Sequence, residues 1–272
     1  MKKILSLIGL TIFTVALAAC GGKETSKEDN VLKVGASPTP HAEILEHIKP
    51  KLKEEGVELE IVEFQDYILP NKALSLNEID ANYFQHIPYF EQAVKDNGYD
   101  FTNAGSVHIE LMAFYSQSLK DIKDLKDGAT VLVSNSSTDW GRVITILQNA
   151  GLVKVKDGVD LLTATFDDIT ENPKKLSFKY DVNPELMTTA YKNNEADLIA
   201  INANFAETLG LAPEEDGVLV EENNSPYANI VAVNTSDKDS EKIQKLMDAL
   251  TDEETQTWIK EKWNGKVIPV TK

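Results

Sequence analysis

Cysteine is almost absent from the 272-residue sequence, which contains only Cys20. A single cysteine rules out a disulfide bond within the chain, and it excludes a cysteine-based metal site or catalytic dyad. Arginine is equally scarce, because Arg142 is the only one. The 27 lysines and arginines are outnumbered by 44 acidic residues, which gives a formal net charge of −17. Nucleic-acid binding is therefore excluded, since contacts to phosphates need clustered basic side chains.

The motifs of several common enzyme classes are missing as well. The chain has no G-x-S-x-G, no H-E-x-x-H and no P-loop. Pairs of carboxylates are present, but a chain with 44 acidic residues produces such pairs by chance. The sequence therefore predicts a protein without catalytic residues and without a cofactor.

Long hydrophobic runs are absent except at the start, where residues 4–19 are apolar or small. This run is shorter than the roughly 20 residues that span a bilayer, and the lysines before it are typical of a secretory signal. It ends in Leu17-Ala18-Ala19-Cys20, which resembles the lipobox of bacterial lipoproteins. We predict a signal peptide over residues 1–19 and lipidation of Cys20. An ordinary signal with an incidental cysteine is the alternative, but exported chains rarely keep a lone free thiol.

Residues 21–30, GGKETSKEDN, contain no apolar side chain. Such a segment buries nothing that would offset the entropy of ordering it, so residues 20–30 are predicted to be a flexible tether. The acidic body behind it would be repelled by an anionic membrane, so the lipid is the expected membrane attachment. The protein is expected to lie outside the cytoplasm on the cell membrane.

From Val31 onward, short apolar runs alternate with amphipathic helical stretches. The runs VLKVG, VELEIVEF, ATVLVS, LSFKYDV and ADLIAIN predict strands. Ile44, Leu45, Ile48 and Leu52 share a helical face, and Pro50 is expected to kink or split that helix. A second helical stripe, from Val143 to Ala150, ends at Gly151. This order predicts an α/β fold with mostly parallel sheets, and the length suits two lobes.

Two apolar runs, HIELMAFYS at 108–116 and YANIVAVN at 227–234, are candidates for segments that cross between the lobes. If both cross, the first lobe is discontinuous. The predicted division is residues 31–110 plus 231–272 for lobe 1 and residues 111–230 for lobe 2.

Aromatic side chains gather in IDANYFQHIPY, residues 79–89, which leaves a short strand and enters a helix marked by Pro88. Ligands of α/β sheets bind beyond the carboxyl ends of strands, so Phe84 and His86 are expected to face a cleft. Tyr67 stands at a similar strand-to-helix junction, where its ring can close a pocket. The alternative reading is that these rings form ordinary core and that His86 caps a helix.

Arg142 follows a strand at the start of a helix, in NSSTDWGR, where backbone amides and a guanidinium can meet a carboxylate. Asn202 and Asn229 lie next to other predicted strands, and their carbonyl oxygens are plausible acceptors for an ammonium group. Taken separately, each asparagine is also an ordinary turn residue.

Six stretches, in this order, resemble the NLPA-type methionine-binding lipoproteins, the substrate-binding components of methionine ABC importers. They are DYILPNKAL, IDANYFQHIPY, the GR of NSSTDWGR, ENPKKL, INANFA and SPYANI. The resemblance covers nearly all of residues 31–270. It implies a two-lobed fold like that of periplasmic binding proteins, of a type II-like kind, with a ligand cleft between the lobes. It also implies a monomer that closes on L-methionine or a similar amino acid and docks on an ABC permease and its ATPase.

By matching positions, the resemblance implies that Arg142 holds the ligand carboxylate and that Asn202 and Asn229 hold its amino end. Tyr67, Phe84, His86 and Tyr89 would line the side-chain pocket, where flat rings suit a polarizable thioether. No metal is expected.

The chain departs from the family pattern at Ser137 and Trp140, and at Leu111 in IELM, where relatives often carry IEPM. We expect these changes to spare the amino-acid clamp and to affect side-chain preference, with Trp140 near the pocket. A buried polar clamp rejects compounds that lack its partner groups far more strongly than an apolar pocket rejects a methylene. A dipeptide or another apolar amino acid thus remains an alternative ligand. A metal-binding lipoprotein using His41, His47, His86 and His108 is a second alternative.

Overall fold

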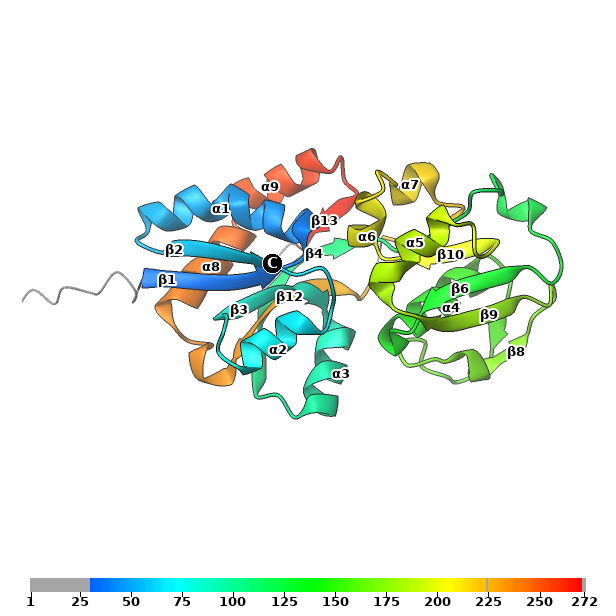
Figure 1. The fold of residues 1–272 in the computed structure, drawn as a ribbon, viewed down its shortest axis with the longest axis horizontal. Helices are drawn as coiled ribbons and strands as arrows, with labels where there is room; N and C mark the ends of the chain where they lie inside the picture. The colour runs from blue at the N-terminus through cyan, green and yellow to red at the C-terminus, as the bar shows by residue number, and fades with distance from the viewer. Residues whose placement is uncertain (1–29, 224, 271–272) are drawn as a thin grey trace, which may run out of the picture.

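The computed structural model of the chain describes residues 30–223 and 225–270. The predicted signal peptide, Cys20 and the tether up to residue 29 lie outside the described residues. The described chain forms two large sheets that lie side by side, each covered by helices, and one small two-stranded sheet (Figure 1). We call the six-stranded sheet with its helices lobe 1 and the five-stranded sheet with its helices lobe 2.

Lobe 1 has the strand order β13-β4-β12-β3-β1-β2. The strands are β1 (Val31–Ala36), β2 (Glu58–Glu63), β3 (Ala81–His86), β4 (Phe101–Glu110), β12 (Ala228–Asn234) and β13 (Val267–Pro269). Strands β1, β2 and β3 are parallel to one another, whereas β12 is antiparallel to both β3 and β4. Because β12 returns to this sheet from the far end of the chain, lobe 1 is built from two separate parts of the sequence.

Lobe 2 has the strand order β11-β5-β10-β6-β9. The strands are β5 (Ala113–Tyr115), β6 (Thr130–Ser134), β9 (Ser177–Val182), β10 (Leu198–Ile201) and β11 (Leu219–Val220), and a small separate sheet pairs β7 (Lys154–Val155) with β8 (Ile169–Glu171). Strands β6, β9 and β10 are parallel, while β5 is antiparallel to its neighbours β10 and β11. The expectation of mostly parallel sheets is therefore wrong. The reason is that the strands next to the crossing segments run back into each sheet in the opposite sense.

The helices cover both faces of each sheet. They are α1 (Glu43–Glu54), α2 (Leu69–Ser75), α3 (Ile87–Asn97), α4 (Trp140–Asn149), α5 (Met187–Lys192), α6 (Ala203–Glu207), α7 (Pro213–Asp216), α8 (Glu241–Thr251) and α9 (Glu253–Lys262). Helices α1, α8 and α9 share one core of lobe 1 with the sheet, and the apolar stripe predicted from Ile44 to Leu52 is buried in it. Helix α1 continues through Pro50, which lies on its exposed side, so the helix is not split there.

The chain passes between the lobes twice in the described residues. The first passage is residues 111–112 between β4 and β5, and the second lies between β11 and β12. Strand β12 begins at Ala228, so the boundary between the lobes that was predicted at residue 231 falls inside this strand. Outside these passages, the Glu207 carboxylate in lobe 2 accepts hydrogen bonds from Thr39 Oγ1 at 2.8 Å and Trp263 Nε1 at 2.7 Å in lobe 1. The two lobes thus meet in a closed arrangement.

Gly141, in the first turn of α4, lies under the loop at residues 160–162. A Cβ atom added there would stand 2.0 Å from the carbonyl oxygen of Leu161, which is backbone and has little freedom to move. We expect Gly141→Ala to lower the free energy of unfolding by about 1–3 kcal/mol, the usual cost of overpacking. Urea unfolding measures this directly. An unchanged midpoint would show that the loop yields without cost.

Candidate functional site

A cavity of about 30 Å³ lies between the lobes. Its lining contains all seven residues that the sequence singled out for ligand binding. The full lining is Tyr67, Phe84, Gln85, His86, Tyr89, Glu110, Asp139, Arg142, Asn202, Ala203, Asn204 and Asn229. The volume has room for about one or two water molecules, so the side chains of the two lobes nearly meet here.

Aromatic rings form one wall of the cavity. The ring centroid of Tyr67 lies 5.9 Å from those of both Phe84 and Tyr89, and Phe84 and Tyr89 are 6.0 Å apart. Across the cleft, the ring centroid of Phe205 of lobe 2 lies 5.1 Å from that of Tyr67. The Tyr67 hydroxyl donates to Asn204 Oδ1 at 2.6 Å, and burial raises the pKa of Tyr67 well above its usual value. The wall thus offers flat apolar surface held in place by polar edges.

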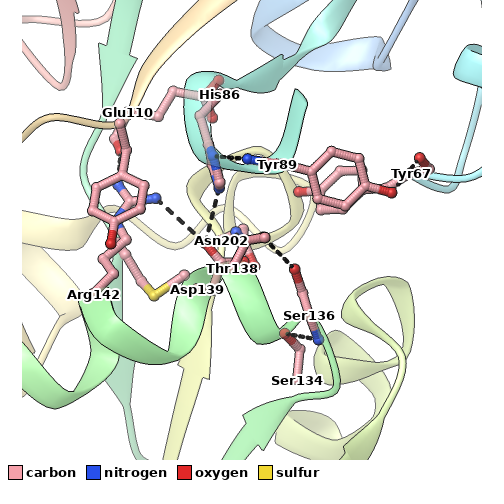
Figure 2. Close-up of polar contacts among 12 residues, drawn as sticks. Tyr67, His86, Tyr89, Glu110, Ser134, Ser136, Thr138, Asp139, Arg142 and Asn202 are labelled. Carbon is pink, nitrogen blue, oxygen red and sulfur yellow. Dashed lines mark hydrogen bonds and ion pairs between the residues drawn. The ribbon is translucent and has the colours of Figure 1, made fainter. Parts of the chain in front are cut away.

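His86 ends β3 and is the N-cap of α3. Its Nδ1 accepts a hydrogen bond from the backbone N–H of Tyr89 at 3.1 Å. The ring proton therefore sits on Nε2, which donates to Asp139 Oδ1 at 3.0 Å across the cleft. The sequence allowed His86 to be either a helix cap or a residue facing the cleft. In the structure it is both, because it caps α3 and also lines the cavity (Figure 2).

Asp139, which the sequence analysis did not single out, joins the two lobes at the cavity. Its carboxylate accepts from His86 of lobe 1 and from Asn202 Nδ2 of lobe 2 at 3.1 Å, and it lies 4.0 Å from Arg142 Nη1 (Figure 2). Asp139 is 1% exposed. Burial alone would raise the pKa of Asp139, but the hydrogen bonds from His86 and Asn202 and the charge of Arg142 outweigh it and lower the pKa.

Arg142 is buried, and much of its hydrogen-bonding capacity is already used. Its Nε donates to Glu221 Oε2 at 2.6 Å, and its Nη2 contacts both that carboxylate and the backbone oxygen of Glu110. Burial alone would lower the pKa of Arg142, but the charges of Glu221 and Asp139 outweigh it and raise the pKa. A guanidinium has five N–H donors, so Nη1 is the nitrogen left to meet a ligand carboxylate.

Glu221, at the start of the second passage between the lobes, was also missed. Besides Arg142 it binds the backbone N–H of Met112 at 3.0 Å and Ser225 Oγ at 2.7 Å. This one carboxylate therefore connects the arginine to both passages. Nothing in the sequence pairs Glu221 with Arg142, because the two are 79 positions apart.

The two asparagines offer different groups to the cavity. Asn202 uses its Nδ2 on Asp139, which leaves its carbonyl oxygen as an acceptor, as expected for an ammonium partner. Asn229 instead has its Oδ1 within 3.1 Å of His41 Nε2, so its Nδ2 is the free donor.

The histidines invoked for a metal site lie in three different places. His47 stacks on Trp258 and His86 binds Asp139, whereas His41 and His108 meet at Glu110. The donor atoms of His41, His108 and Glu110 lie within 4.8 Å of one another, so these three could hold a metal ion. This grouping could not be predicted from the sequence, because His41 lies in the segment Pro38–Ala42, far along the chain from His108 and Glu110 of β4.

Trp140 does not lie near the pocket as expected. Its ring packs on Phe166 and Tyr180 at 5.6 and 4.9 Å, and its Nε1 donates to the backbone oxygen of Ser134 at 2.9 Å. It is not among the cavity residues, and neither are Ser137 and Leu111. These three departures from the family pattern therefore lie outside the cavity lining.

Two α/β lobes, joined by two crossing passages around a small polar and aromatic cavity, define a binding protein with the periplasmic-binding-protein-like fold. The family model described as NlpA lipoprotein matches residues 32–271, and the chain belongs to that family. The predicted fold class and family are thereby confirmed. No helix in residues 30–223 and 225–270 is long and apolar enough to cross a membrane.

Known relatives are named as binding proteins. The chain is 45% identical over 276 residues to the methionine-binding lipoprotein MetQ of Bacillus subtilis, covering 100% of both. It is 36% identical to the D-methionine-binding lipoprotein MetQ of Escherichia coli K12, covering 98% of this chain and 97% of that one. A nutrient binding protein from Burkholderia cenocepacia bound to methionine is a structural neighbour, with a TM-score of 0.82, 35% identity, and coverage of 88% of this chain and 99% of that chain. These names agree with the prediction of a binding protein rather than an enzyme.

Proposed function

We propose that this protein is the lipid-anchored substrate-binding component of an ABC importer and that it binds free methionine in the cavity between its lobes. The observation that carries the proposal is the meeting of all seven predicted residues at one cavity. Lobe 1 supplies the aromatic wall and Glu110, and lobe 2 supplies Arg142 and Asp139. The names of the relatives support methionine as the ligand.

The charges of the cavity suit an amino acid rather than a simple anion or cation. Arg142 Nη1 is available to a carboxylate, while Asp139, Glu110 and the free oxygen of Asn202 are available to an ammonium group. Beyond these polar groups, Tyr67, Phe84 and Tyr89 present ring surface to the side chain. Contacts between sulfur and aromatic rings contribute about 0.3–1.5 kcal/mol each, which favours a thioether.

Because the lining side chains nearly fill the cavity, methionine enters only when the lobes part. Hinge motion at the two passages would open the cleft, and the ligand would shift the equilibrium toward the closed form. The boundary predicted at residue 231 falls inside β12 of lobe 1, so we propose that lobe 1 comprises residues 31–110 plus 228–272 and lobe 2 residues 111–227. The closed monomer would dock on a permease and its ATPase. Lipidated Cys20 would hold the protein on the outer side of the cell membrane.

Ligand identity is tested by denaturing the purified protein and identifying the released small molecule by mass spectrometry. Calorimetry with L-methionine, D-methionine, glycyl-methionine and leucine then ranks the candidates. We expect methionine to be released and to bind more tightly than leucine. Release of a dipeptide would contradict the proposal in favour of the dipeptide alternative, and stoichiometric chelatable zinc without any amino acid would favour the metal alternative.

Phe84 provides a test of the aromatic wall. We expect Phe84→Ala to weaken methionine binding by about 10- to 100-fold and to reduce the preference for methionine over norleucine, which lacks the sulfur. Phe178→Ala is the matched control, because Phe178 is partly buried against the core of lobe 2 and lies outside the cavity. Calorimetry with both ligands gives the ratio. A preserved ratio in Phe84→Ala would show that this ring does not read the sulfur.

A further inference from the structure

A buried group of side chains in lobe 1 lies directly behind the cavity wall. We call it the histidine cluster: His41, Tyr83, His108 and Glu110. His41 comes from the short helical segment Pro38–Ala42, Tyr83 from β3, and the other two from β4. Three of the four are at most 1% exposed, and only Glu110 reaches the cavity lining. The binding residues described so far do not account for the other three.

The partners of three of the four ring nitrogens place the protons in the cluster, while His41 Nδ1 has no hydrogen-bond partner among the described residues. His41 Nε2 lies 3.1 Å from Asn229 Oδ1 and 3.3 Å from Glu110 Oε1, and both of these atoms are acceptors. The proton of His41 must therefore be on Nε2. His108 Nε2 lies 2.9 Å from Glu110 Oε1 and donates to it, while its Nδ1 accepts from the Tyr83 hydroxyl.

Each histidine in this arrangement carries one proton and no charge. Burial is the main reason that the pKa of His41 is lowered to about 4 and that of His108 to about 3, which agrees with neutral rings near pH 7. The charged groups near the cluster are Glu110 itself and Arg142. Burial raises the pKa of Glu110, and the charge of Arg142 opposes this rise without cancelling it. Two neutral N–H donors thus converge on Glu110, and one of them also reaches Asn229.

The consequence is a defined orientation of two cavity residues. An unrestrained asparagine amide can rotate to present either its oxygen or its nitrogen. With Oδ1 engaged by His41, Asn229 presents Nδ2 to the cavity, and Glu110 presents its carboxylate beside it. Asn229 is also held between β3 and β4, opposite His86 and His108 in the sheet register.

We propose that His41 is a positioning residue for ligand binding, which through its Nε2–H makes Asn229 a hydrogen-bond donor and holds Glu110 as the adjacent acceptor. The ligand then meets a donor and an acceptor in a set order, which determines how the zwitterionic end of an amino acid lies in the cleft. This inference rests on the proposed function and adds to it a residue that lies behind the cavity lining.

The test compares three variants in calorimetry with L-methionine. His41→Phe keeps a ring against Tyr83 but removes the donor, and we expect binding to weaken by about 10- to 100-fold. His41→Gln returns an N–H donor and should bind within about threefold of the parent. His47→Phe is the matched control, because His47 is a histidine of the neighbouring helix that lies outside the cavity. Equal binding by the parent and His41→Phe would overturn the inference.

A double-mutant cycle separates positioning from a general structural role. In the Asn229→Ala background, His41→Phe should change methionine affinity by less than about threefold, since its effect passes through Asn229. If the full loss persists in that background, His41 does not act through Asn229 and the inference fails. The proton position is tested without any variant by ¹⁵N NMR of the histidine rings, where His41 is expected as the Nε2–H tautomer and the Nδ1–H tautomer would overturn the inference.

Two further outcomes are distinguishable. If purified protein holds stoichiometric zinc that His41→Phe releases, the nitrogen is a metal ligand and the positioning role is wrong. If the parent protein binds no amino acid at all, the proposed function fails. If the parent and His41→Phe bind methionine with equal affinity, the proposed function stands and only the role of His41 is wrong.

Discussion

Replacing Arg142 by alanine is expected to abolish measurable methionine binding. The guanidinium is the only arginine side chain in the sequence, and its Nη1 is the donor left for a ligand carboxylate. Removing one partner of a buried charged hydrogen bond costs about 2–5 kcal/mol, or roughly 30- to several-thousand-fold in affinity. Calorimetry measures the loss of methionine affinity. The control is Lys126→Ala, which replaces an exposed cation and should bind methionine like the parent.

The same substitution should destabilise the fold, because Glu221 would keep a buried charge without its partner. Loss of one partner of a buried ion pair typically costs about 3–5 kcal/mol. The double variant Arg142→Ala with Glu221→Gln separates the two effects, since it removes the unpaired charge. We expect it to regain part of the stability in urea unfolding while still failing to bind methionine. Recovery of binding in the double variant would contradict a role for Arg142 in holding the ligand.

Asp139 is expected to show the second large effect. Asp139→Ala removes the acceptor shared by His86 of lobe 1 and Asn202 of lobe 2, and it leaves buried donors unpaired. We expect methionine affinity to fall at least about 100-fold and the free energy of unfolding to fall by about 3–5 kcal/mol. Calorimetry and urea unfolding measure the two quantities. The exposed Asp127→Ala is the control, and an Asp139→Ala protein that binds normally would show that this contact is not part of closure.

Asp139 also predicts a pH dependence. Its pKa is lowered in the folded protein, so the carboxylate binds protons more weakly there than in the unfolded chain. The resulting stability is fully present above the unfolded value of about 3.9 and is lost as the pH falls through the lower folded pKa. The difference in unfolding free energy between the parent and Asp139→Asn should therefore shrink as the pH is lowered below about 4. A difference that stays constant down to pH 2 would contradict this assignment.

The sequence was informative about the cavity wherever the functional residues follow strands. Tyr67, Phe84, His86, Arg142 and Asn202 all lie where a strand gives way to a helix, and such positions meet at the edge of an α/β sheet. The hydrogen-bond and ion-pair partners of these residues could not be predicted from the sequence. Tertiary structure brings Glu221 to Arg142 and His41 to Asn229, because the chain returns between the lobes and across a sheet. Local sequence patterns do not encode which distant residues meet in this way.

The strand directions show the same limit. Hydrophobic alternation predicted the strands well, but it did not reveal that β12 runs antiparallel between β3 and β4. Strand direction depends on the connection that precedes the strand, and β12 follows a passage from the other lobe. Likewise, the predicted interruption of α1 at Pro50 did not occur, because the stripe from Ile44 to Leu52 is buried on one face throughout.

By itself the sequence determined the α/β class and, together with its resemblance to a known family, the cleft between two lobes and seven of the residues that line it. Periodicity and strand-end position are local properties, so the sequence records them. Only the tertiary structure decided the electrostatics of that cleft: which carboxylate neutralises Arg142, which acid joins the lobes, and which way Asn229 faces. Coulomb and hydrogen-bond energies act over a few ångströms in space, and the groups concerned are brought within that range only when the chain has folded.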